Sequence, residues 1–125
     1  MLVSDRAHRL KVETRLAILE NITALNRQRK AAIQAGDTSQ VTAIQDSINA
    51  LTDQLDDLSF LSLESLEDSP EVNQTITALR GAALELESQA DTIKNVADAV
   101  QKAAQIINVA AKIVTQLSGL ATAAV

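Results

Sequence analysis

The chain lacks cysteine, tryptophan and tyrosine, and Phe60 is its only aromatic residue. The absence of cysteine excludes disulfides. Hydrophobic residues still make up 46% of the 125 residues, and they are Leu, Ile, Val and many Ala. A core built from such residues is thin and brings helix backbones close together, which suits paired helices better than a globular pocket.

Glycine and proline are also scarce. Pro70 is the only proline, and the three glycines are Gly36, Gly81 and Gly119. Because these residues give the backbone few places to turn, long helices are expected. The length is that of one domain, and the apolar content is too high for a disordered chain. We therefore predict a single all-α domain that spans residues 1–125.

Capping signals predict the first two helices. Ser4 can cap a helix over residues 4–35, and Gly36 supplies the left-handed residue that ends it. The segment Asp37-Thr38-Ser39-Gln40 resembles a capping box and predicts a second helix over residues 38–58. Helical spacing on the first helix gives a broad apolar stripe of Leu10, Val12, Leu16, Leu19, Ile22, Leu25, Ala32 and Ile33. On the second helix, alternating steps of three and four give the coiled-coil seam Val41, Ile44, Ile48, Leu51, Leu55 and Leu58.

Residues 59–69 are less regular, and we expect a short helix or a folded-back connection there. Ser69-Pro70-Glu71 then reads as a helix start, with a serine cap, a proline in the first turn and an acid at the positive helix end. A helix over residues 70–122 is predicted from this point, about 75 Å long at 1.5 Å per residue.

One heptad register supports the continuity of this last helix. One seam position holds Val72, Leu79, Leu86, Ile93, Val100, Ile107 and Val114, and the other holds Ile76, Ala83, Ala90, Ala97, Ala104 and Ala111. The predicted fold is therefore an elongated antiparallel helical bundle or coiled-coil hairpin of three helices, the last very long. A break near residues 88–95, which gives a four-helix bundle, is the structural alternative.

Charge is distributed unevenly along the chain. Residues 1–36 hold seven Lys or Arg against three acids, whereas residues 37–93 hold Arg80 against twelve acids. Opposite charges on the flanks of paired helices help them to select each other, so the first helix is predicted to lie antiparallel to the second. The acidic total and the lack of stacking aromatics argue against nucleic-acid binding.

The sequence offers no set of residues for catalysis. His8 is the sole histidine, so neither a site with two imidazoles nor a Cys–His pair can form within one chain. Asp53, Asp56 and Asp57 cluster, but without the glycine-containing loop of an EF-hand they are interpreted as a solvated acidic face. No glycine-rich phosphate loop or nucleophile turn is present. We predict that the chain is not an enzyme and holds no cofactor or metal.

The segment 103–125 carries only one charge, Lys112. Its apolar residues form a second stripe beside the seam. A helix that is apolar around so much of its circumference must be buried on more than one side. Because a continuous helix over 70–122 would project beyond the shorter second helix, its far end would lack a cover within the chain. This excess predicts contact residues at Ile106, Ile107, Val109, Ile113, Val114, Leu117 and Leu120.

Three functions are consistent with such a surface. The favoured one is a helical assembly or interaction module that binds itself, as a homo-oligomer, or a partner helix. The first alternative is a membrane-active protein of the α-helical pore-forming type, against which polar residues in the segment and the missing aromatic belt both argue. The second is a toxin-neutralising or chaperone-like binding protein. The first residues lack the apolar core of a signal peptide, which favours the cytoplasm or non-classical export.

Overall fold

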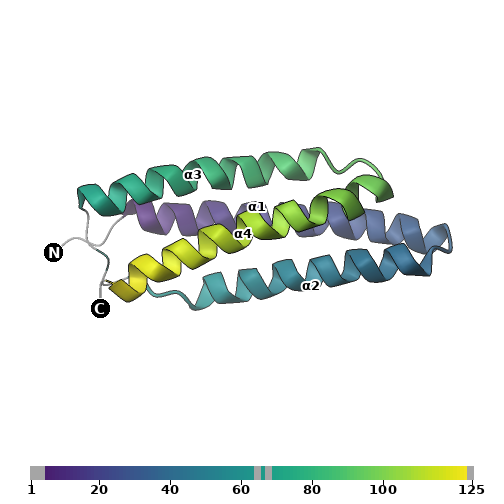
Figure 1. Cartoon of the computed structure of the whole chain (residues 1–125), viewed down its shortest axis with the longest axis horizontal. Helices are drawn as coiled ribbons and strands as arrows, with labels where there is room; N and C mark the ends of the chain where they lie inside the picture. The colour runs from purple at the N-terminus through teal and green to yellow at the C-terminus, as the bar shows by residue number, and fades with distance from the viewer. Residues whose placement is uncertain (1–4, 64–65, 67–68, 124–125) are drawn as a thin grey trace.

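The computed structural model describes residues 5–63, 66 and 69–123, and it is all-α, with no strand in these ranges. Its four helices are α1 (Asp5–Gln34), α2 (Thr38–Phe60), α3 (Pro70–Asp91) and α4 (Val96–Ala123). They lie side by side as an elongated bundle (Figure 1). The all-α prediction is confirmed, and the arrangement is the four-helix alternative rather than the three-helix one.

The first turn and the starts of α2 and α3 follow the predicted caps, whereas the cap predicted at Ser4 lies outside the described residues. Gly36 has φ of +74°, and the Asp37 amide donates to the Ala32 carbonyl at 3.1 Å, which ends α1 with a left-handed residue. Asp37 Oδ1 accepts from the Gln40 amide at 3.1 Å and so caps α2. Ser69 Oγ accepts from the Val72 amide at the same distance and caps α3. These local signals needed no tertiary information.

The segment between α2 and α3, called the crossing segment, joins two helices that are not neighbours in the bundle, and its residues 61–63, 66 and 69 are described. α1 packs against all three other helices, whereas α2 and α3 make no contact through the residues that are described. Two residues of the crossing segment, Leu63 and Leu66, are buried and close that end of the core. Lys11 of α1 holds the segment in place by donating from Nζ to the Leu61 carbonyl at 2.9 Å.

α1 and α3 are parallel neighbours. Near the start of both helices, Arg6 Nη2 donates to Thr77 Oγ1 at 2.8 Å. Further along both, Asn21 Nδ2 donates to the Leu86 carbonyl at 2.7 Å. Because the two contacts advance in the same direction along the chain, they fix both the direction and the register of the pair.

The prediction of one helix over 70–122 is wrong, because α3 ends at Asp91 and α4 begins at Val96. Asn95 Oδ1 accepts from the Asp98 amide at 2.8 Å, and Asp98 Oδ2 accepts from the Lys94 amide at 3.2 Å. This reciprocal cap starts a new helix. Lys102 Nζ donates to the Thr92 carbonyl at 3.0 Å, just past the end of α3. The chain therefore turns back at residues 92–95.

The turn changes which face of α4 is buried. In α3 the predicted seam is confirmed, since Ile76, Leu79, Ala83 and Leu86 are buried. In α4 the predicted seam residue Val100 is 39% exposed. Most buried residues belong instead to the second apolar stripe, namely Ala103, Ile106, Ala110, Ile113 and Leu117. The seam residue Val114 is buried as predicted, and Ala99 and Ala121 are also buried. Register that persists along a sequence does not by itself identify the buried face after a turn.

The seam of α2 is as predicted, whereas the stripe of α1 is only partly so. Leu10, Leu25 and Ala32 of that stripe are buried, but Val12, Leu16 and Ile33 are more than half exposed. Ile44, Leu51 and Leu58 of α2 are buried. In α1 the buried positions include three polar residues at heptad spacing, Thr14, Asn21 and Gln28. They alternate with small or apolar residues on the same face: Ala7, Leu10, Ala17 and Ala24. Small side chains on this face let the backbones of α1 and α3 approach closely enough for the Asn21 bond.

Thr14→Val is expected to stabilise the bundle. Thr14 is fully buried, and its Oγ1 has no hydrogen-bond partner among the described residues. Valine keeps the shape and removes a desolvated hydroxyl, so the free energy of unfolding should rise by about 1 kcal/mol. Urea denaturation measures it. Thr42→Val on the surface of α2 is the matched control and should change stability by less than about 0.5 kcal/mol. A loss of stability in Thr14→Val would show that the Thr14 hydroxyl is not a buried group without a hydrogen-bond partner.

Candidate interaction surfaces

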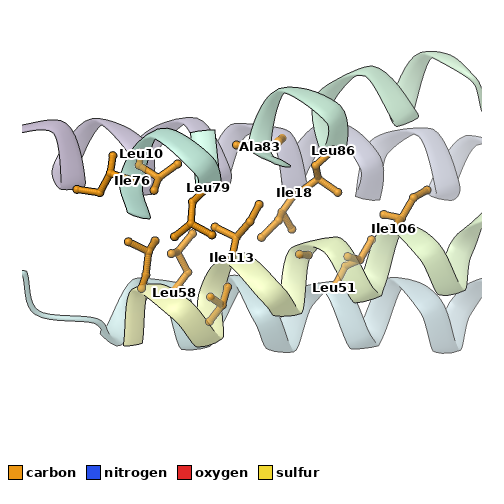
Figure 2. Packing of buried hydrophobic residues seen from close by; sticks show 14 of the residues in the cluster. Leu10, Ile18, Leu51, Leu58, Ile76, Leu79, Ala83, Leu86, Ile106 and Ile113 are labelled. Atoms are coloured by element: carbon orange, nitrogen blue, oxygen red, sulfur yellow. The ribbon is translucent and has the colours of Figure 1, made fainter. Parts of the chain in front are cut away.

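The seven predicted contact residues lie in or against the core of the bundle. Ile106, Ile113 and Leu117 are fully buried, and Val114 is nearly so. Figure 2 shows Ile106 and Ile113 among core side chains such as Leu79 and Leu51. The other three are partly buried and pack against the same cluster: Ile107, Val109 and Leu120. Contact of these seven residues with a partner stays a prediction, and it now requires the bundle to open.

The premise of an uncovered helix end is wrong, for a geometric reason. It assumed one long helix that outruns a short second helix. Because the chain turns at residues 92–95, α4 instead packs against α1, α2 and α3, and its 28 residues are close in number to the 23 of α2. The excess apolar surface of residues 103–121 is thereby covered within the chain.

Exposed apolar residues gather instead on the outer side of α1 and α3. Val12 and Leu16, one helical turn apart on α1, are 58% and 54% exposed, and Leu84 of α3 is 56% exposed. Two contacts between the helices bracket Leu16 and Leu84. Arg80 Nε lies 3.4 Å from Glu13 Oε2 before them, and Asn21 Nδ2 donates to the Leu86 carbonyl after them. Val12 lies one residue before Glu13. Val12, Leu16 and Leu84 and the two hollows beside them are called the α1/α3 face below.

The first hollow of this face lies toward the start of α1 and α3. It has a volume of about 20 Å³ and is lined by Arg6, Arg9, Leu10, Glu13, Ile76 and Arg80. Three arginines stand against one glutamate, which gives the lining a net charge of +2. We call it the basic hollow.

The second hollow begins at Leu16 and lies beside the middle of α1 and the end of α3. Its volume is about 460 Å³, and its lining comprises Leu16, Leu19, Glu20, Thr23, Ala24, Arg27, Glu87, Ala90 and Asp91. Three carboxylates stand against one arginine, so the net charge is −2. We call it the acidic hollow. Together the two hollows give one face opposite charges at its two ends.

The basic α1 packs against the acidic α2, as predicted from the sequence. α1 and α2 are neighbours that run in opposite directions. Their charges are not joined by ion pairs, however, because the one ion pair between described residues links Glu13 of α1 to Arg80 of α3. The charged residues that line the acidic hollow form no ion pair with another described residue: Glu20, Arg27, Glu87 and Asp91.

A second candidate surface surrounds Phe60, the last residue of α2. The only aromatic side chain of the protein is 88% exposed. It borders a groove of about 380 Å³ between α2 and α4, whose lining also includes Gln54, Asp57, Leu61, Val114, Thr115 and Ser118. With one exposed apolar side chain above a mostly polar rim, this groove offers less apolar contact than the α1/α3 face.

The residues considered for metal binding and catalysis lie apart on the surface. His8 is exposed near the start of α1, and Asp53, Asp56 and Asp57 are exposed along α2. In the part of the chain that the structure describes, no cluster of three or more His, Cys, Asp or Glu has the arrangement to hold a metal ion. Within the same ranges, no helix combines the length and apolar character needed to cross a bilayer.

No family model matches the chain, and comparisons with curated proteins and with solved structures give no match either. The surface of the bundle is therefore the guide to function. On that surface, sequence reasoning placed Val12 and Leu16 in a buried stripe and did not single out Leu84. A signal was present, because Leu10 and Val12 are about 200° apart on a helix and cannot face the same core.

Proposed function

We propose that the chain is a non-enzymatic helical interaction module and that its α1/α3 face binds a protein. The observation that carries the proposal is an inversion within α1. Val12 and Leu16 are more than half exposed, whereas Thr14 and Asn21 of the same helix are fully buried. An interaction module is also the function predicted from the sequence, but the contact surface proposed here is the α1/α3 face and not residues 103–125.

Stability of the isolated bundle does not account for this inversion. Full burial of a leucine or valine side chain contributes about 1.5–3 kcal/mol, which α1 forgoes at Val12 and Leu16. The hydroxyl of Thr14 and Oδ1 of Asn21 are buried without hydrogen-bond partners among the described residues, which reduces stability further. Contact with another protein would recover the burial that the bundle leaves unused.

The two hollows add specificity to the apolar centre. Val12, Leu16 and Leu84 lie between a lining of net charge +2 and one of net charge −2. Complementary charges steer encounter and fix register, while the apolar centre supplies affinity. A protein surface with an apolar strip between opposite charges fits this arrangement better than a bilayer. An anionic bilayer surface would attract the basic hollow but repel the acidic one.

Photo-crosslinking in the producing cells tests this function. A benzophenone amino acid at Leu16 or Leu84 should give adducts of defined mass, because both side chains would lie inside the contact. The same group at Thr52 of α2 or Gln101 of α4, both exposed, is the matched control and should give few adducts. The additional substitution Val12→Lys should reduce the adducts at Leu16. Equal labelling at all four positions, or none at Leu16 and Leu84, would refute the proposal.

A further inference from the structure

The charges of the α1/α3 face make it complementary to itself. The basic hollow and the acidic hollow have net charges of equal size and opposite sign, and they lie on either side of the three exposed apolar residues. A surface whose two ends attract each other can pair with a copy of itself through a two-fold axis across its centre, which gives an isologous interface. The two-fold axis can lie across the helices or along them, and the charges favour one of these two orientations.

We propose that the occupant of the α1/α3 face is a second copy of this chain, with its α1 and α3 antiparallel to those of the first. This inference rests on the proposed function and names its partner. A two-fold axis across the helices places the basic hollow of each copy over the acidic hollow of the other. An axis along the helices would instead place basic over basic, which costs binding free energy.

Residue spacing supports one position for the axis. On α1, Arg9 and Glu20 are exposed at opposite ends of the face, and their midpoint falls between Val12 and Leu16. On α3, Arg80 and Glu87 have their midpoint beside Leu84. Since the exposed apolar residues of both helices lie at one level, a single axis satisfies both helices. It pairs Arg9 with Glu20 of the second copy and packs Val12 against Leu16 of the second copy.

Complementary charge reversal tests this arrangement. Arg9→Glu and Glu20→Arg each create two like-charge contacts in a homodimer, so sedimentation equilibrium in low salt should show dimers at least about tenfold weaker than wild type. When the two variants are mixed, every affected contact again joins opposite charges, and dimers of near wild-type affinity should form. Circular dichroism should show unchanged helicity, because both side chains are exposed.

Controls use the same charge changes on other faces. Lys112→Glu on α4 and Asp53→Arg on α2 are exposed and lie outside the α1/α3 face, and both should dimerise like wild type. A wild-type chain that stays monomeric at millimolar concentration overturns the inference. So does a dimer that Arg9→Glu and Glu20→Arg leave unchanged, or single variants that fail to recover on mixing. The proposed function fails separately, if Leu16 and Leu84 form no photo-adducts; adducts with a different protein and no dimer would overturn only the self-pairing.

Discussion

The double substitution Ile113→Asp/Leu117→Asp is expected to unfold the bundle. Both side chains have no exposed surface and belong to the hydrophobic core. Figure 2 shows Ile113 among the core side chains. A buried, unpaired carboxylate lowers stability by several kcal/mol, and two of them approach the whole stability of a typical domain, about 5–15 kcal/mol. If Ile113 and Leu117 instead formed an exposed contact surface, the double substitution would dissociate an assembly into subunits that stay folded.

Thermal unfolding followed by circular dichroism measures the effect. The variant should lose its cooperative transition and most of its helical signal at 25 °C. Gln105→Asp/Gln116→Asp is the matched control, because it adds the same two charges to exposed positions of α4. This control should keep a transition close to that of wild type. A folded, cooperatively melting Ile113→Asp/Leu117→Asp chain would show that this face of α4 is not enclosed as described.

Asn95→Ala/Asp98→Ala is expected to destabilise the turn between α3 and α4. The two side chains accept hydrogen bonds from the Asp98 and Lys94 amides, and α4 loses both caps in the double variant. Each lost cap lowers the free energy of unfolding by about 1 kcal/mol, so a loss of about 2 kcal/mol is expected. For a chain of this size the melting midpoint should fall by about 8 °C.

The same substitution should also favour a continuous helix through residues 92–95. Alanine removes the groups that stop the backbone there, and a straight α3–α4 helix would place α4 on another chain as a swapped dimer. Gel filtration after refolding at high concentration should show more dimer than for wild type. Gln101→Ala/Asn108→Ala, both exposed within α4, is the control. Unchanged melting of the Asn95/Asp98 variant would mean that these caps do not hold the turn.

Local signals in the sequence predicted most helix boundaries. Gly36, Asp37 and Ser69 act through hydrogen bonds to residues a few positions away, and each caps its helix as expected. The same type of signal was present at Asn95-Val96-Ala97-Asp98 and was outweighed by the unbroken heptad register. That register continues past the turn because α4 carries apolar residues at more positions than its buried face uses, and Val100 of the register is 39% exposed.

The exposed face could not be predicted in the same way. α1 and α4 each carry more apolar residues than one seam needs, and the choice of buried side depends on which helices pack beside them. In α1 the parallel approach of α3 selects a face of small and polar side chains, including Thr14 and Asn21, and leaves Val12 and Leu16 outside. Leu84 joins them only because the register of that pair places it at their level. Spacing along one helix shows that Leu10 and Val12 cannot both be buried, but which of the two faces the core is decided by tertiary packing.

The central place of α1 has a consequence for synthesis on the ribosome. α1 and α2 emerge first, yet much of the seam of α1 is covered only by α3 and α4. During that interval water can hydrate Thr14, Asn21 and Gln28. The nascent α1–α2 hairpin therefore exposes less apolar surface than it would with leucines at these positions. Thr14 and Asn21, whose unpaired oxygens lower the stability of the finished bundle, are therefore expected to reduce association of the α1–α2 hairpin before α3 and α4 are made.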